Sequence, residues 1–132
     1  MIKSESFVSV VTVIHGHLEE VYEPLRKLSL TLDESYSDYE IVVVVPGVNS
    51  THAKIEDRIL KDINCVRIIL LSTPVYHDVA LAAGLENAIG DFVVLWNPAA
   101  DPVEIVPQIV EQCRAGSDIV IGVTNKVRSL RY

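Results

Sequence analysis

The chain has 132 residues, of which 49% are hydrophobic, so it is long enough to form one domain with a sizeable buried core. Its formal net charge of −7 argues against nucleic acid and against an anionic membrane surface as main partners. The longest apolar runs fall well short of the roughly 18 residues of a membrane-spanning helix, which argues against direct membrane insertion.

The N-terminal part of the sequence predicts a strand followed by a helix. Residues 7–14 (FVSVVTVI) are rich in β-branched side chains, as buried strands are. After the interruption His15-Gly16-His17, apolar residues recur at helical spacing over residues 18–32. Pro24 lies inside this pattern, so we expect the regular helix to begin there or to be kinked there.

The next segment predicts a turn, a strand and a second helix. Residues 35–38 are predicted as a polar turn, and residues 41–45 as a buried apolar strand. Residues 49–51 (NST) fit an acceptor sequence for N-glycosylation. We interpret them instead as a turn in which Ser50 or Thr51 caps a helix that continues to residue 63.

A third strand and a helix of small residues follow. The strand is predicted at residues 66–71 and the helix at residues 77–88. The helix contains small residues that would let it lie close to a neighbouring strand or to a ligand: Ala80, Ala82, Ala83 and Gly84. Gly90 is predicted to end this helix in the left-handed conformation.

The fourth predicted strand is followed by the turn in which we expect any chemistry. Residues 92–96 (FVVLW) form an apolar run that suits a strand buried on both faces of a parallel sheet. Asn97-Pro98 ends the strand, and Asp101 is predicted to cap a new helix with Pro102 at its first position. Turns at the carboxyl ends of strands bind ligands in open α/β sheets, so we expect a site at residues 97–101.

The remaining sequence completes an alternation of strands and helices. Residues 103–114 predict a helix, residues 118–123 a fifth strand, and residues 125–132 a short basic tail. Strands that alternate with helices through short links predict an α/β fold with a mostly parallel sheet and helices on both faces. We expect residues 1–132 to form a single domain.

Two further expectations concern the cysteines and the compartment. Cys65 and Cys113 do not make a disulfide scaffold in a chain of this size, and we interpret both as buried structural thiols. The first residues lack the apolar stretch of a signal peptide, so we expect the chain to be cytoplasmic.

Several strings of the sequence resemble the N-terminal, nucleotide-sugar-binding half of family-2 glycosyltransferases. Residues 8–13 resemble the opening strand of that family, and residues 38–44 its second strand. The most specific string, ALAAGLENAIGDFVVL at residues 80–95, resembles the pattern A-x-x-A-G-L-x-x-A-x-G-D-x-V-x-x-L. Residues 101–104 (DPVE) and 116–122 (GSDIVIG) are similar to two later motifs. The resemblance implies the GT-A fold, with its Rossmann-like sheet.

The sequence departs from this family where the family has its acidic residues. The second strand of the family ends in a carboxylate pair that helps to hold the nucleotide base, and here Val45 and Pro46 occupy those positions. The fourth strand of the family ends in an Asp-x-Asp motif that binds the divalent metal, and here the chain reads Asn97-Pro98-Ala99. The following loop is also one residue shorter.

The resemblance implies a nucleotide-sugar site at the ends of the first, second and fourth strands. Its positions are Val13, His15, Val45, Pro46, Asn97 and Asp101. The family would use Mg²⁺ or Mn²⁺, but these ions need hard anionic ligands that are missing here, so we expect no metal cofactor. The family's catalytic carboxylate and acceptor-binding region would follow residue 132, so no catalytic residue is assigned. Arg128 and Arg131 are candidates for stabilising the charge of a leaving group without a metal.

Histidines and one tryptophan lie close to the predicted site. His15, His17 and His77 follow strands that end at one edge of the sheet, but they lack the spacing of a metal-binding motif. Trp96 is interpreted as part of the core, with a stacking platform or a subunit contact as alternatives.

Three functional hypotheses follow from the sequence. The first is a glycosyltransferase-like domain of polysaccharide synthesis that has lost its metal-dependent donor site and acts in binding or assembly. The second is an active, metal-independent transferase or the donor-binding half of one. The third is a structural oligomerisation domain. For partners, we expect a nucleotide-sugar and either a second copy of the chain or another glycan-synthesis protein.

Overall fold

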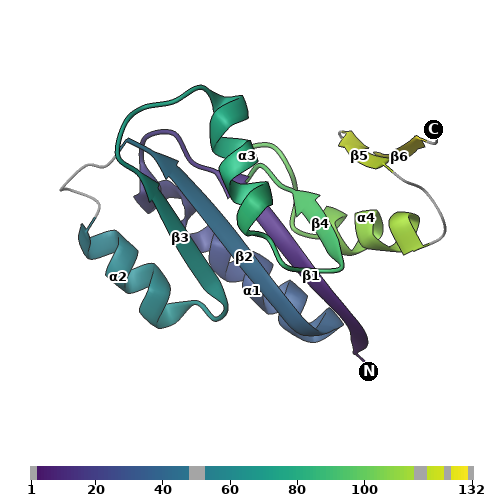
Figure 1. Cartoon of the computed structure of the whole chain (residues 1–132). Helices are drawn as coiled ribbons and strands as arrows, with labels where there is room; N and C mark the ends of the chain where they lie inside the picture. Colours follow the sequence, from purple (N-terminus) through teal and green to yellow (C-terminus); the bar gives the residue numbers. More distant parts are fainter. Residues whose placement is uncertain (1–2, 48–52, 115–118, 124–125, 131–132) are drawn as a thin grey trace.

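The computed structural model describes residues 3–47, 53–114, 119–123 and 126–130 (Figure 1). Its main sheet has four strands, all parallel, in the order β3-β2-β1-β4. The strands are β1 (Ser4–Val13), β2 (Tyr36–Pro46), β3 (Val66–Leu71) and β4 (Phe92–Leu95). The helices are a short 3-10 helix η1 (Leu18–Val21), α1 (Tyr22–Ser35), α2 (Ala53–Asp62), α3 (His77–Asn87) and α4 (Ile105–Arg114). None of these helices is long and apolar enough to cross a membrane.

The order of the strands places a topological switch point between β1 and β4. From β1 the chain moves to β2 and β3 on one side, and then crosses back to β4 on the other side of β1. Val10 of β1 lies between Ile41 of β2 and Val94 of β4 in the register of the sheet. In open α/β sheets this arrangement opens a crevice at the carboxyl ends of the two strands that flank the switch.

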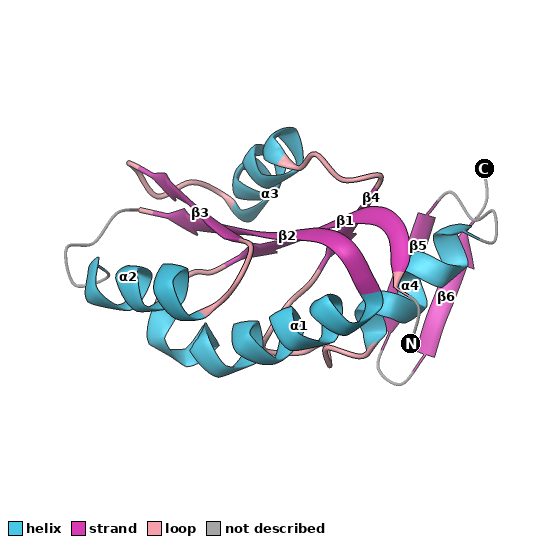
Figure 2. Ribbon diagram, turned by 90° about the horizontal axis from the view of Figure 1, so that it is seen from below, coloured by secondary structure: helices cyan, strands magenta, loops and turns pink. Residues whose placement is uncertain are grey.

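Helices cover both faces of the sheet, and one face is covered more completely than the other. α1, α2 and α4 pack on one face, where the larger hydrophobic core lies. α3 alone packs on the opposite face, over a smaller cluster around Val11, Val42 and Val44 (Figure 2). The predicted fold, an α/β domain with a parallel sheet between helices, is therefore confirmed.

Small residues let α3 lie directly on the sheet, as the sequence predicted. Ala80 and Gly84 form its buried side, whereas Ala82 is exposed. A Cβ atom at Gly84 would lie 2.5 Å from Val11 Cγ1 and 3.1 Å from Val44 Cγ2. A larger residue at position 84 would therefore push the helix away from β1 and β2.

Gly90 has a different role from the predicted one. It does not have the positive φ of a left-handed helix cap, and α3 ends at Asn87 with Ala88 in an extended conformation. Instead, a Cβ atom at Gly90 would lie 2.8 Å from the backbone N of Ser9 and 2.9 Å from the carbonyl oxygen of Phe7. The glycine is required because the chain passes so close to β1.

The first helix and the second strand differ from the sequence prediction at their boundary. The predicted polar turn at residues 35–38 is wrong, because α1 continues to Ser35 and β2 begins at Tyr36. The side chains of Tyr36 and Tyr39, in the part of β2 that precedes the predicted strand, are both buried. Pro24 lies in the first turn of α1, where its missing N–H has no intrahelical partner to lose.

β4 is buried on one face only, so the prediction of a strand buried on both faces is wrong. It pairs with β1, and its other edge pairs with no strand in the part of the chain that the structure describes. Val94 is buried, but Val93 and Leu95 are 42% and 49% exposed on the face that carries α3. A single helix on that face is too narrow to cover the outermost strand.

The predicted fifth parallel strand is also corrected. β5 (Ile119–Val123) is a strand, but it pairs antiparallel with β6 (Lys126–Leu130) in a separate two-stranded sheet. The predicted basic tail therefore contains a strand that includes Arg128. Arg131 and the predicted cap at residues 50–51 lie outside the described residues, as does the sequence NST at residues 49–51.

The two cysteines differ from each other in exposure. Cys113 packs against the core on α4, and burial raises the pKa of its thiol. Cys65 is exposed, so the prediction that both thiols are buried is wrong for this residue. It lies in the turn before β3 with a φ of 63°, in the left-handed region. In that turn the Cys65 carbonyl accepts a hydrogen bond from the Ile41 N–H at 2.8 Å.

A buried carboxylate connects three strands with the segment between α3 and β4. Glu40 in β2 is 6% exposed, and its Oε2 accepts hydrogen bonds from Ser9 Oγ (2.6 Å) and the Ile89 N–H (2.8 Å). Its Oε1 accepts from the Arg67 guanidinium at 2.6 and 3.0 Å. Ser9 Oγ accepts in turn from the Gly90 N–H at 2.8 Å. Burial raises the pKa of Glu40, but these hydrogen bonds outweigh it and hold the pKa below its usual value.

We predict that Glu40→Gln lowers the free energy of unfolding by about 1–3 kcal/mol at neutral pH, because an amide cannot accept all of these bonds. A carboxylate whose pKa is lower in the folded state stabilises the protein above its unfolded-state pKa, and this contribution is lost as the pH falls through the folded-state pKa. The difference between wild type and variant should therefore shrink in acid.

Urea unfolding at neutral pH and at about pH 3 measures this difference. Glu34→Gln, an exposed change on α1, is the matched control and should leave stability unchanged. A Glu40→Gln variant as stable as wild type at neutral pH would show that the network does not stabilise the fold.

Candidate functional site

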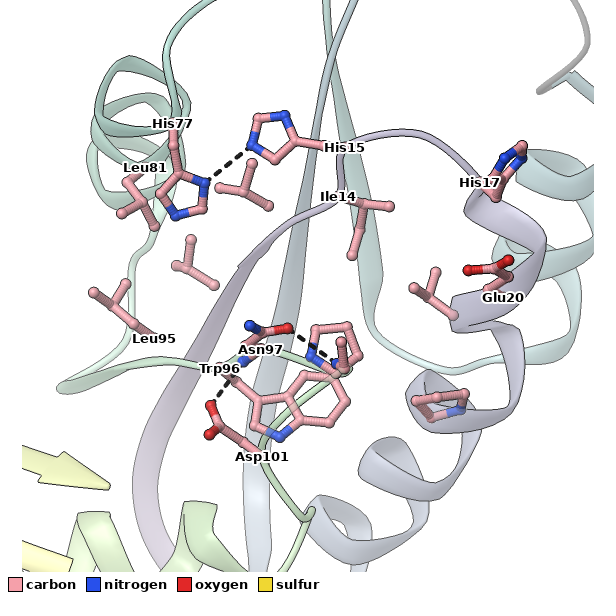
Figure 3. A pocket seen from close by; sticks show the side chains of 16 residues that line it. Ile14, His15, His17, Glu20, His77, Leu81, Leu95, Trp96, Asn97 and Asp101 are labelled. Atoms are coloured by element: carbon pink, nitrogen blue, oxygen red, sulfur yellow. Dashed lines mark hydrogen bonds between the residues drawn. The ribbon is translucent and has the colours of Figure 1, made fainter. Parts of the chain in front are cut away.

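A cavity of about 600 Å³ lies at the switch point, at the carboxyl ends of β1 and β4 (Figure 3). Its walls come from the ends of these strands, the loop after β1 with η1, the start of α1, the start of α3 and the turn after β4. The lining residues are Val11, Val13, Ile14, His15, His17, Glu20, Val21, Pro24, His77, Leu81, Leu95, Trp96, Asn97, Pro98, Ala99 and Asp101. This is the position in which an α/β sheet binds its ligand.

The turn after β4 is closed by its own polar side chains. Asn97 Oδ1 accepts a hydrogen bond from the Ala99 N–H at 3.0 Å, and Asp101 Oδ2 accepts one from the Asn97 N–H at 2.9 Å. The Asn97 carbonyl accepts from the N–H groups of Ala100 and Asp101. The side chains that the sequence singled out for ligand binding therefore also hold the turn in shape.

The predicted capping role of Asp101 is wrong. α4 begins at Ile105, four residues further on, so Asp101 and Pro102 precede the helix. The intervening residues form turns in which the N–H of Ile105 bonds to the carbonyl of Pro102. Asp101 points back to Asn97 because its carboxylate accepts from that residue's N–H.

The residues of this turn do not fit a divalent cation. Mg²⁺ and Mn²⁺ favour several carboxylate oxygens around one point. Asn97 offers a neutral oxygen that already accepts a hydrogen bond, and Ala99 offers none. Among the described residues, no three histidine, cysteine, aspartate or glutamate side chains come together to hold a metal ion.

Two of the three predicted histidines meet at the rim of the cavity. His15 Nε2 and His77 Nδ1 are 3.0 Å apart, and their ring centroids are 5.3 Å apart. Figure 3 shows the two rings facing each other from the loop after β1 and the start of α3, with His17 lying apart from them. Of the three histidines that the sequence places at one edge of the sheet, only His15 and His77 are therefore in contact.

Trp96 forms the floor of the cavity and also belongs to the core. It is 4% exposed and packs with the cluster that includes α4, which supports core packing. Little of its surface remains for stacking on a ligand. Its indole Nε1 has no hydrogen-bond partner among the described residues.

Four of the six predicted site residues line the cavity. Val13, His15, Asn97 and Asp101 do so, because the ends of β1 and β4 are neighbours in the sheet. Val45 and Pro46 do not line it, since β2 lies on the far side of β1 and Val45 points into the core.

Sequence reasoning missed two kinds of cavity residue. Glu20 and Val21 come from η1, which lies within the helical pattern predicted over residues 18–32 and was not singled out as part of the site. Leu81 and Leu95 form an apolar wall. The spacing of Leu81 from Ala80 and Gly84 was the available signal, because it places the leucine beside the buried stripe of α3.

Comparison with known proteins adds to this geometry. No protein-family model matches the chain. It is 30% identical over 120 residues to an undecaprenyl-phosphate 4-deoxy-4-formamido-L-arabinose transferase of Pseudomonas fluorescens, over 89% of the chain and 35% of that protein. The chain is similar to glycosyltransferases.

Two other relatives agree with this similarity. The uncharacterized glycosyltransferase YkcC of Bacillus subtilis is 26% identical over 126 residues, which are 89% of the chain and 37% of that protein. A protein of Mycobacterium tuberculosis described as putative glycosyltransferases is 30% identical over 117 residues, 87% of the chain and 34% of that protein. The chain thus spans about a third of the length of the curated relatives that it matches.

We predict that Asp101→Ala lowers the free energy of unfolding by about 1 kcal/mol, because it removes the acceptor that closes the turn after β4. Since the turn does not fit a divalent cation, millimolar Mn²⁺ should leave the stability of wild type and variant unchanged. Thermal unfolding with and without Mn²⁺ measures both effects. Glu104→Ala, which removes an exposed carboxylate three residues away, is the control. Stabilisation of the wild type by Mn²⁺ that Asp101→Ala abolishes would contradict the prediction.

Proposed function

We propose that the chain is a family-2 glycosyltransferase-like domain that binds a nucleotide-diphosphate sugar in the cavity without a divalent metal. By itself it does not transfer the sugar. The observation that carries the proposal is a ligand-sized cavity at the switch point, bordered by Asn97 and Ala99 where a metal-dependent site needs carboxylates. The similarity to glycosyltransferases supports the choice of ligand.

The composition of the cavity suits a ligand with an apolar or planar part and a charged part. Val13, Leu81, Leu95 and Pro98 supply apolar walls, and the polar groups gather at the rim and at the turn after β4. Pockets for small molecules combine these features. Without a metal, the charge of a leaving diphosphate is poorly stabilised, so the domain favours binding over catalysis.

The role that follows is binding or assembly within glycan synthesis. Such a domain would hold a nucleotide-sugar, or compete for it, without consuming it. The alternative of an active, metal-independent transferase has the same cavity and differs in turnover.

We predict that nucleotide-diphosphate sugars bind to the chain with the same affinity in EDTA and in Mn²⁺, because no metal takes part. Isothermal titration calorimetry with UDP-glucose and GDP-mannose as probes measures this, and a coupled assay for released nucleotide should show no turnover. Ala99→Trp, which places an indole at the cavity wall, should weaken binding at least about tenfold.

The matched control is Ala100→Trp, since Ala100 is the exposed neighbour that does not line the cavity. Binding that requires Mn²⁺ would contradict the proposal, and so would the absence of binding to every nucleotide-sugar tested. Metal-independent turnover would support the active alternative instead.

A second candidate function, self-association, is favoured by the exposed apolar surface around β4. Val93 and Leu95 on β4, and Leu85 and Ile89 beside it, are each more than 40% exposed. An edge strand with exposed apolar residues is a ready surface for pairing with another chain. We therefore propose that the chain forms a homo-oligomer through this surface.

We predict that the chain elutes as a dimer or larger oligomer, and that Val93→Lys shifts it toward monomer, because a lysine on β4 would be desolvated in the interface. Size-exclusion chromatography with light scattering measures the mass. Leu60→Lys, at an exposed apolar position on α2, is the control and should leave the mass unchanged. A wild-type monomer at high concentration would exclude this candidate.

A further inference from the structure

The histidine pair at the rim of the cavity is brought together by the fold alone. His15 lies in the loop after β1, and His77 begins the helix α3, 62 residues later in the chain. Their side chains are exposed, yet Nε2 of one lies 3.0 Å from Nδ1 of the other. Figure 3 shows the pair on the side of the cavity opposite Asp101.

Among the side chains that line the cavity, the histidines are the ones that can carry positive charge toward a ligand. No lysine or arginine is among the described residues that line it, and Glu20 and Asp101 contribute carboxylates. A diphosphate in this cavity would meet negative charge at η1 and at the turn after β4. The groups that can become cationic are His15, His17 and His77, and of these His15 and His77 lie together.

We propose that His15 and His77 bind the diphosphate of the nucleotide-sugar and supply the positive charge that a divalent metal provides in metal-dependent enzymes. This inference rests on the proposed function, because it identifies how the same cavity holds the charged part of its ligand. The role assigned to the two histidines is to bind the ligand.

The contact between the rings limits where their protons can lie. A hydrogen bond between His15 Nε2 and His77 Nδ1 needs a proton on one of these atoms and none on the other. When His15 donates, His77 carries its proton on Nε2, which is then a donor for a phosphate oxygen. One added proton makes His15 cationic without breaking the contact, since its Nδ1 takes that proton. The pair can therefore hold a positive charge and present N–H donors at once.

The surroundings add to this arrangement and also limit it. α3 begins at His77, so the positive end of its dipole lies beside the pair. Three carboxylates surround the pair. Asp78 follows His77 in the first turn of α3, whereas Glu20 and Asp101 line other walls of the cavity. Water screens these exposed carboxylates, whereas a phosphate that contacts the pair interacts directly.

Binding through the pair should depend on pH in a defined direction. Imidazole has an ordinary pKa of about 6.5, and a bound phosphate stabilises the cationic form. Binding of the phosphate is therefore coupled to protonation of the pair. Affinity should increase as the pH falls from about 8 to about 6, with proton uptake on binding.

The test is calorimetry with UDP-glucose in EDTA at about pH 6 and about pH 8, because the charge of its diphosphate does not change between these values. We expect the wild type to bind at least about tenfold more tightly at the lower pH. The double variant His15→Gln/His77→Gln should lose about tenfold in affinity at pH 6 and should lose the pH dependence. Lys54→Gln, which removes an exposed positive charge on α2, is the control for net charge and should bind as the wild type does.

A second readout separates binding from a structural role. Proton NMR at about pH 6 should show the imidazole resonances of His15 and His77 changing their chemical shifts when UDP-glucose is added. Thermal unfolding of the double variant checks that it folds.

The outcomes distinguish this inference from the function on which it rests. If the wild type binds UDP-glucose and the folded double variant binds it equally well, the inference is overturned and the proposed function stands. If the wild type binds pyrophosphate through the two histidines but binds no nucleotide-sugar, the phosphate site stands and the proposed function fails. Affinity that is equal at both pH values, or that rises with Mn²⁺, also overturns the inference.

Discussion

The buried carboxylate of Glu40 is the interaction on which the arrangement of this domain depends. It lies on the central strand β2 and accepts bonds from β1, β3 and the segment that leads into β4. Because an unpaired charge in this position would be costly, these groups must stay together. Gly90 makes the close passage over β1 possible, and β4 then pairs beside β1 in a fixed register. The network thus fixes the segment that leads into β4, at the end of the sheet away from the cavity.

The cavity follows from that switch point, and its chemistry follows from the residues at its edge. β1 and β4 end side by side, so the loop with His15 and the turn from Asn97 to Asp101 face the same space. The turn satisfies its own hydrogen bonds instead of presenting anionic ligands. The scaffold is therefore a parallel α/β sheet with a cavity at its switch point, and the edge of the cavity carries the imidazoles of His15 and His77 together with the turn at Asn97.

The two faces of the sheet divide the molecule into a stable part and an open part. Three helices bury most of one face, and the larger hydrophobic core lies there. On the other face α3 covers β1 and β2 but leaves the outer residues of β4 exposed. The curated relatives are described as glycosyltransferases, and each is about three times as long as the region that this chain matches. Leu95 belongs both to this exposed surface of β4 and to the lining of the cavity.

The sequence by itself determined the parallel α/β fold and the third strand to the residue, because apolar runs and turn residues report local structure directly. Of the six site positions that the family resemblance implied, four line the cavity. Only the tertiary structure decided that Val45 and Pro46 lie away from the cavity, that β4 is an edge strand, and that β5 leaves the main sheet. It also decided that Asp101 closes a turn and that Gly90 passes β1 at close range. These features depend on which segments become neighbours in space, and the pairing of distant strands leaves no local pattern in the chain.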